Sequence, residues 1–158
     1  MKIVITSQGK TLKDDLDPRF GRCQYFLIVD DETNEVEAIP NPQVSAGGGA
    51  GIQTAQFMVD RGVKAILTGN MGPNASKVLN EAGIKVYINN SGTGESVLND
   101  FKNGKYYEVD LPPNNLHFVN LNPNIEYFFK DYEYFHFKAM IKKISIVHDD
   151  GWLEENNI

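Results

Sequence analysis

The sequence is poor in the residues that cross-link a chain or bind metal ions. Its 158 residues include a single cysteine, Cys23. One thiol excludes a disulfide within the chain, and it cannot supply the several ligands of a zinc site by itself. Any metal that Cys23 holds therefore needs ligands from elsewhere as well.

Long apolar runs and an excess of basic charge are also missing. No stretch of about 18 apolar residues could cross a bilayer, and the start at Met1 lacks the features of a signal peptide. We therefore expect a cytoplasmic protein without membrane contact. With 15 Lys and Arg against 21 Asp and Glu, the net charge is −6. This balance argues against nucleic acid as a partner, because duplex binding relies on phosphate neutralisation.

Catalytic signatures are missing too. The sequence contains no GxSxG, HExxH or protein-kinase motif. The acidic run Asp30–Glu32 resembles the carboxylates that hold Mg²⁺ in hydrolases. Its place between two predicted strands favours solvated turn residues instead.

What the sequence does contain is an alternation of short apolar runs and helical patterns. Five runs read as strands: 2–6, 25–29, 36–39, 63–67 and 84–88. A polar turn joins the second run to the third, which predicts an antiparallel hairpin. The other runs connect through helices and should pair in parallel. The sequence thus predicts a three-layer α/β fold, with a mixed five-stranded sheet between flanking helices.

Three helices are predicted from apolar periodicity and terminal signals. The first should follow Gly47–Gly51 and turn Ile52, Ala55 and Val59 toward the core. We expect Asn74 to cap the second helix and Thr93 to cap the third. Glycines mark the three predicted ends, at Gly62, Gly83 and Gly104.

The chain changes character after about residue 110. A break at 112–115 leads into a segment that carries many aromatic residues and all three histidines. So many exposed aromatics would be a liability, so we expect this segment to pack on the core or on another subunit. The predicted division is a domain over 1–110 and an aromatic-rich extension over 111–158, whose role the sequence does not indicate.

Reactive side chains are densest in the segment 17–23, which we call the basic loop. Arg19 and Arg22 offer forked donors to an anion, and their charge would lower the pKa of Cys23 toward the thiolate. Thiolates bind soft metals and clusters. In the alternative interpretation, Cys23 is a small buried residue and the arginines pair with Asp14, Asp15 or Asp17. The residue types alone leave both interpretations open.

Two glycine-rich loops complete the set of candidates. Gly47–Gly51 precedes a helix, so its backbone N–H groups and the helix dipole could hold an anion, although a flexible connection explains it equally well. Gly69–Asn74 follows a buried strand at the carboxyl edge of the sheet, where α/β proteins bind ligands. Simple helix-entry chemistry is its alternative explanation. Because both loops should share one edge, we expect a ligand site there.

Residues 1 to about 106 resemble the dinitrogenase iron-molybdenum cofactor biosynthesis family. The resemblance is carried, in this order and spacing, by DPRFGRCQYFLIVD (17–30), GGGAGIQTAQ (47–56), LTGNMGPNASKVL (67–79) and AGIKVY (82–87). It implies a ribonuclease H-like fold. It also implies a protein that is not an enzyme, but that binds or carries an iron-sulfur or molybdenum-containing cluster, or a precursor, between donor and acceptor proteins.

The resemblance also implies which residues form the site. The cofactor-binding candidates are Arg19, Phe20, Gly21, Arg22, Gly47, Gly48, Gly49, Gly51, Gly69, Asn70, Gly72 and Asn74, and the metal-ligand candidate is Cys23. An anion- or phosphate-binding regulatory or assembly module without metal is the alternative function. A metal-dependent nuclease is a weaker one, because the first strand supplies no carboxylate.

Overall fold

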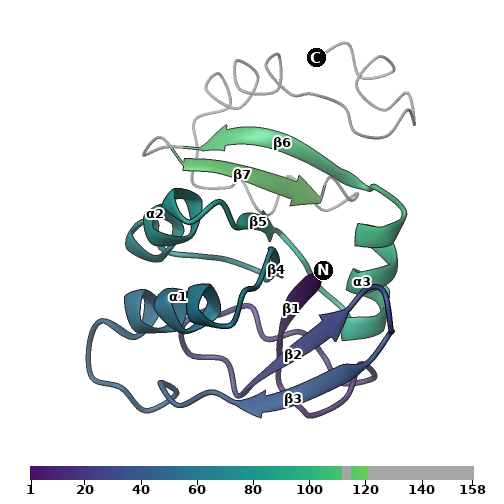
Figure 1. Ribbon diagram of the computed structural model, residues 1–158, viewed down its shortest axis with the longest axis horizontal. Helices are drawn as coiled ribbons and strands as arrows, with labels where there is room; N and C mark the ends of the chain where they lie inside the picture. The colour runs from purple at the N-terminus through teal and green to yellow at the C-terminus, as the bar shows by residue number, and fades with distance from the viewer. Residues whose placement is uncertain (112–114, 121–158) are drawn as a thin grey trace.

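Seven strands form one mixed sheet in the computed structural model, which describes residues 1–111 and 115–120 (Figure 1). The strands are β1 (Lys2–Ser7), β2 (Tyr25–Asp30), β3 (Val36–Pro40), β4 (Ala65–Leu67), β5 (Lys85–Ile88), β6 (Tyr106–Leu111) and β7 (Asn115–Asn120). The helices are α1 (Ala50–Asp60), α2 (Pro73–Glu81) and α3 (Gly94–Lys102). All five predicted strands form, and so do the three predicted helices.

The strand order is β3-β2-β1-β4-β5-β7-β6. Strand β2 pairs antiparallel with both β1 and β3, whereas β1, β4 and β5 pair in parallel, as their helical connections predict. The predicted hairpin and the mixed sheet are therefore confirmed. Strands β6 and β7 add an antiparallel hairpin that the sequence analysis did not predict, and β7 joins the sheet in parallel beside β5.

Two helical layers cover the sheet. Helices α1 and α2 lie on one face and α3 on the other, which confirms the three-layer fold (Figure 1). The unbroken apolar run of β1 serves both faces, since Val4 packs in the cluster under α1 and α2 while Ile3 and Ile5 pack in the cluster under α3. Burial on both faces explains why this strand shows no polar alternation.

Two predictions about the helices were wrong. The buried residues of α1 are Ala50, Thr54, Ala55 and Met58, and Ile52 is instead 45% exposed. The second helix begins one residue before Asn74, so Gly72 is its N-cap. The Thr93 cap is confirmed, because its hydroxyl accepts a hydrogen bond of 3.2 Å from the Ser96 N–H.

The predicted boundary at residue 110 falls within the β6–β7 hairpin, and the division of the chain into two parts stays a prediction. Predictions for residues 112–114 and 121–158, including the packing of the aromatic segment, lie outside the described residues. Across the part that is described, no helix is both long and apolar enough to cross a membrane.

Candidate ligand-binding cleft

The three candidate loops lie at one edge of the sheet. Strands β1 and β3 end where β2 begins, since Ser7 and Pro40 both pair with Tyr25. Strand β4 ends at the same edge, because Leu67 pairs with Ile5 near the end of β1. The basic loop, the Gly47–Gly51 loop and the Gly69–Asn74 loop therefore converge as the strand order requires.

These loops enclose a cleft of about 470 Å³, within the size range of small-ligand sites. Most of the predicted binding residues line it: Arg19, Phe20, Gly21, Arg22, Gly49, Gly51, Asn70, Gly72 and Asn74. Gly47, Gly48 and Gly69 do not line it, and neither does Cys23. No aspartate or glutamate of the part of the chain that the structure describes is among the lining residues.

Glycines allow the loops to touch. A Cβ atom on Gly69 would lie 2.6 Å from the Cα atom of Pro18, and one on Gly21 would lie 3.0 Å from the backbone nitrogen of Gly51. At the first contact the Asn70 N–H donates to the Pro18 carbonyl oxygen at 2.8 Å. Gly69 therefore shapes the cleft without lining it, because it seats the basic loop against the loop that follows β4.

Two helix N-termini open into the cleft. No side chain caps α1 or α2, and neither helix has an acidic residue in its first turn. The first-turn N–H groups of a helix lack intrahelical partners, and the helix dipole adds positive charge there. Residues from both first turns, among them Gly51 and Ala75, line the cleft. The backbone thus favours an anion at this place.

The side chain of Arg19 is paired with a buried carboxylate. Its Nε and Nη2 atoms donate to the two oxygens of Asp17 at 3.0 and 2.9 Å. Asp17 is 1% exposed, whereas the Arg19 side chain is 61% exposed. The hydrogen bond and charge of Asp17 raise the pKa of Arg19. The pairing proposed in the alternative interpretation is therefore confirmed for Arg19, and it offsets the charge that this residue brings to the cleft.

Arg22 has a different set of partners. Its guanidinium donates to the carbonyl oxygens of Ala46 at 2.8 Å and Gly47 at 3.3 Å. Among residues 1–106, no carboxylate forms an ion pair with it. No carboxylate in this part of the chain therefore offsets the charge of Arg22. Gly47 enters the site indirectly, through the carbonyl oxygen that holds Arg22.

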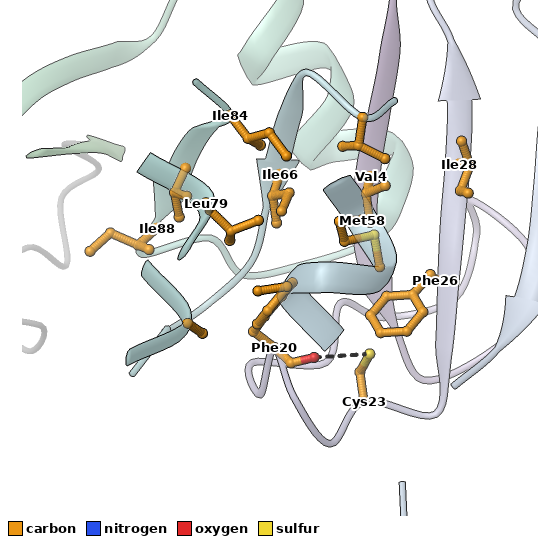
Figure 2. Packing of buried hydrophobic residues seen from close by; sticks show 14 residues of the cluster. Val4, Phe20, Cys23, Phe26, Ile28, Met58, Ile66, Leu79, Ile84 and Ile88 are labelled. Atoms are coloured by element: carbon orange, nitrogen blue, oxygen red, sulfur yellow. Dashed lines mark hydrogen bonds between the residues drawn. The ribbon is translucent and has the colours of Figure 1, made fainter. Parts of the chain in front are cut away.

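Cys23 faces the core and not the cleft (Figure 2). It is 0% exposed, and its Sγ atom donates to the Phe20 carbonyl oxygen at 3.6 Å. Burial raises the pKa of this thiol to about 12. The prediction that the arginines lower its pKa toward the thiolate was wrong, because desolvation outweighs the charge of Arg19. Metal ligation by Cys23 stays a prediction.

Some lining residues were not predicted. They are Pro18, Ala50, Ile52, Met71, Pro73 and Ala75. Most of them lie beside predicted residues in the same loops. Their position in these loops could therefore have predicted them. Ile52 was assigned to the core instead. Met71 carries a thioether, a soft sulfur group, so the sulfur-containing residue of the cleft lining is Met71 and not the cysteine.

The acidic run Asp30–Glu32 lies at the edge of the sheet opposite to the cleft. Asp30 pairs with Lys2 at the start of β1, and the backbone N–H groups of Glu32 and Thr33 lower the pKa of its carboxyl group. Asp30 ends β2, and Asp31 and Glu32 lie in the turn that follows, so the interpretation as turn residues is confirmed for Asp31 and Glu32. Within the described residues, no group of three or more His, Cys, Asp or Glu side chains is arranged to hold a metal ion.

The fold and the cleft together define an α/β protein with an anion-favouring site at the carboxyl edge of its sheet. The family model described as dinitrogenase iron-molybdenum cofactor matches residues 1–104. The chain belongs to this family.

The chain is also similar to individual proteins and solved structures. An uncharacterized protein of Methanocaldococcus jannaschii is 37% identical over 93 residues, which cover 57% of this chain and 79% of that protein. The apo form of the orange protein from Desulfovibrio gigas is 37% identical, with a TM-score of 0.63 over 65% of this chain and 88% of the other. A putative NifB protein from Thermotoga is 36% identical, with a TM-score of 0.58 over the same shares of 65% and 88%.

Proposed function

We propose that the cleft binds an anionic iron-sulfur or molybdenum-containing cluster, or a precursor of one, and carries it without catalysing a reaction. Membership of the iron-molybdenum cofactor family supports a role in cofactor assembly. The observation that carries the proposal is the charge around the cleft. Two guanidinium groups and two uncapped helix N-termini surround it, and none of the described carboxylates lines it.

Each part of the cleft has a task in this function. Arg22 supplies charge that no carboxylate within residues 1–106 offsets. Arg19 supplies a donor fixed in place by Asp17, and the helix N-termini supply backbone N–H groups. Hydrogen bonds and charge hold the cluster without a protein–metal bond. Such a cluster can leave for an acceptor protein as readily as it arrives from a donor. We place this exchange in the cytoplasm.

Ligation by Cys23 is the alternative way to hold the cluster. It requires the sulfur to leave a core in which it is fully buried, and the thiol to lose its proton although its pKa is raised to about 12. The cleft as described needs neither step. We therefore assign Cys23 a role in packing the core and the arginines a role in binding the cluster.

Anaerobic reconstitution tests the proposal. The full-length chain is incubated with iron, sulfide and molybdate, and charge-transfer absorbance and bound metal are measured after gel filtration. Arg22→Gln should lose most of the bound metal. Lys64→Gln removes the same charge at the opposite edge of the sheet and should behave as wild type. Absence of bound metal in the wild-type protein, or equal loading of Arg22→Gln, would contradict the proposal.

An anion-binding module without metal is the second candidate. It is favoured by the burial of Cys23 and by the lack of a metal-ligand cluster within the described residues. Calorimetric titration with inorganic phosphate separates the two functions. Phosphate binding that Arg22→Gln abolishes, without any metal uptake, would favour the second candidate.

The ribonuclease H-like fold is also proposed here. It is supported by the order β3-β2-β1-β4-β5, in which β2 runs antiparallel to its neighbours. The first strand of this chain carries no acidic residue that could hold a catalytic Mg²⁺ ion. We therefore propose that the fold supports ligand binding in the cleft and not metal-dependent hydrolysis.

A further inference from the structure

A chain of buried hydrogen bonds connects the start of β6 with the residues that follow β4. The hydroxyl group of Tyr106 donates to Oδ1 of Asn90. The Nδ2 group of Asn90 donates in turn to the carbonyl oxygens of Thr68 at 3.0 Å and Tyr87 at 2.9 Å. Tyr106 is 2% exposed and Asn90 5% exposed, so these bonds are shielded from water.

The chain continues from Thr68 to the basic loop. The hydroxyl groups of Thr6 and Thr68 share a hydrogen bond of 3.0 Å, and Oγ1 of Thr6 lies 2.6 Å from the Asp17 carbonyl oxygen. Both threonines are 0% exposed. Asp17 then binds the guanidinium of Arg19. We call Tyr106, Asn90, Thr68, Thr6 and Asp17 the Tyr106 network.

This network fixes both loops that meet at Gly69. The Asn89 N–H donates to the Gly69 carbonyl oxygen at 2.9 Å, and the Asn70 N–H donates to the Pro18 carbonyl oxygen at 2.8 Å. Gly69 itself leaves no room for a shift toward Pro18, because even a Cβ atom would clash there. A displacement of Thr68 is therefore passed on to the contact between Asn70 and the basic loop.

We propose that Tyr106 is a positioning residue for the cleft: through Asn90 and Thr68 it fixes Asn70 against the basic loop and so sets the affinity for an anionic ligand. The proposal rests on the proposed function of the cleft. It gives a role to a residue outside the family match, which covers residues 1–104. Strand β6, which begins at Tyr106, is thereby coupled to ligand binding.

The physical reason is the cost of a broken network in a dry interior. Removal of the Tyr106 hydroxyl leaves Oδ1 of Asn90 without the bond that it accepts there. A buried amide oxygen that loses its donor rearranges or draws in water. Either response loosens the bonds from Nδ2 of Asn90 to Thr68, and the loosening reaches the loop that carries Asn70.

A role in packing alone makes a different prediction. The Tyr106 ring lies 5.0 Å from the Tyr87 ring and 6.3 Å from the Phe101 ring, measured between centroids. If only this aromatic packing matters, Tyr106→Phe, which keeps the ring, should leave the cleft unchanged, whereas Phe101→Leu should disturb it. If the hydroxyl group matters, the reverse is expected.

The experiment compares these two variants in the full-length chain. Hydrogen exchange of the Asn70 amide, followed by NMR, reports on the bond to Pro18 without any ligand. Exchange should be roughly three- to tenfold faster in Tyr106→Phe than in wild type, the factor expected for the loss of one buried hydrogen bond. It should stay near wild type in Phe101→Leu. Molybdate affinity, measured by calorimetry, should fall by a similar factor in Tyr106→Phe only.

Each outcome decides something. Unchanged Asn70 exchange in Tyr106→Phe, or an equal change in Phe101→Leu, overturns the positioning role. Faster exchange with unchanged molybdate affinity overturns the link to binding. If wild type binds neither molybdate nor a reconstituted cluster, the proposed function fails, and the exchange data still decide the structural part. Should Tyr106→Phe not fold, Asn90→Ala interrupts the same network at the next residue and is read in the same way.

Discussion

The basic loop has two faces that differ in chemistry although their residues alternate along the chain. Arg19 and Arg22 are exposed and point to the carboxyl edge of the sheet, where they line the cleft. Phe20 and Cys23 are buried in the cluster under α1 and α2. Phe20 belongs to both faces, because it also lines the cleft. Closeness in sequence therefore did not place the thiol beside the guanidinium groups.

Burial decides which chemistry each face can perform. On the outer face, the open cleft leaves the arginines accessible to an anion. On the inner face, the lack of water keeps the thiol protonated. The two faces thus separate charge recognition from packing within a few residues, and the predictions below test how complete this separation is.

The largest effect is expected from moving the whole loop. Gly69→Ala places a Cβ atom 2.6 Å from the Pro18 Cα atom, whereas a Cβ atom on Gly72 would meet nothing within 4 Å. We expect Gly69→Ala to lower stability by about 1–3 kcal/mol and to reduce ligand binding more than tenfold. Gly72→Ala, at an ordinary backbone conformation, should keep the stability of wild type, because its Cβ atom meets nothing within 4 Å. Urea unfolding and metal loading measure both; similar behaviour of the two variants would show that the loop contact is not needed.

The next effect separates the two arginines of the outer face. Arg22→Gln should weaken anion binding by about 10- to 100-fold, since hydrogen bonds to charged groups contribute about 1.5–3 kcal/mol. Its melting temperature should hardly change. Arg19→Gln should lower the melting temperature more than Arg22→Gln, because it leaves the buried Asp17 carboxylate without its guanidinium partner. Calorimetric titration and thermal melts test this contrast, and the reverse pattern would assign the main binding role to Arg19.

A smaller effect is expected on the inner face. Cys23→Ala should cost about 1 kcal/mol of stability, as for other small truncations in a core, and should leave metal loading unchanged. The variant is compared with wild type by urea unfolding and by reconstitution. Loss of loading in a folded Cys23→Ala protein would join the two faces into one site and restore Cys23 as a ligand.

The last effect is confined to alkaline pH. The pKa of Cys23 rises from an ordinary value of 9.0 to about 12 in the folded protein. Between these values the unfolded chain loses the thiol proton and the folded chain keeps it, so stability falls as the pH rises through this window. Below pH 9 the contribution is fully present. The difference in stability between wild type and Cys23→Ala should therefore shrink from pH 9 upward, and a constant difference would mean that the thiol is not shielded.

Local patterns predicted most of the fold. The five apolar runs became strands because their side chains are buried against the helical layers, and the glycines that follow the helices adopt positive φ angles, as at Gly62 and Gly83. The pattern misled where the cleft interrupts the core. The spacing of Ile52 from Ala55 and Val59 predicted a core position. Ile52 lies instead near the N-terminus of α1, where it borders the open cleft.

The site was predicted in outline and not in detail. Loop positions at the sheet edge follow from the strand order, which residue patterns indicate. Burial of Cys23, the partner chosen by each arginine and the contact at Gly69 depend on how loops distant in sequence pack together. The β6–β7 hairpin was missed because its second strand pairs beside β5 and carries polar residues such as Asn115 and His117.

The position of β7 has a consequence for the order of assembly. Strand β7 pairs with the outer side of β5, although it comes after α3 and β6 in the chain. Until residues 115–120 have been synthesised and have folded back, the outer side of β5 presents unpaired N–H and C=O groups. Such an open edge attracts strands of other chains. A fragment of the family-matched residues 1–104 should therefore self-associate more readily than the whole chain. By pairing with β5, β7 protects this edge from other chains once it has been synthesised.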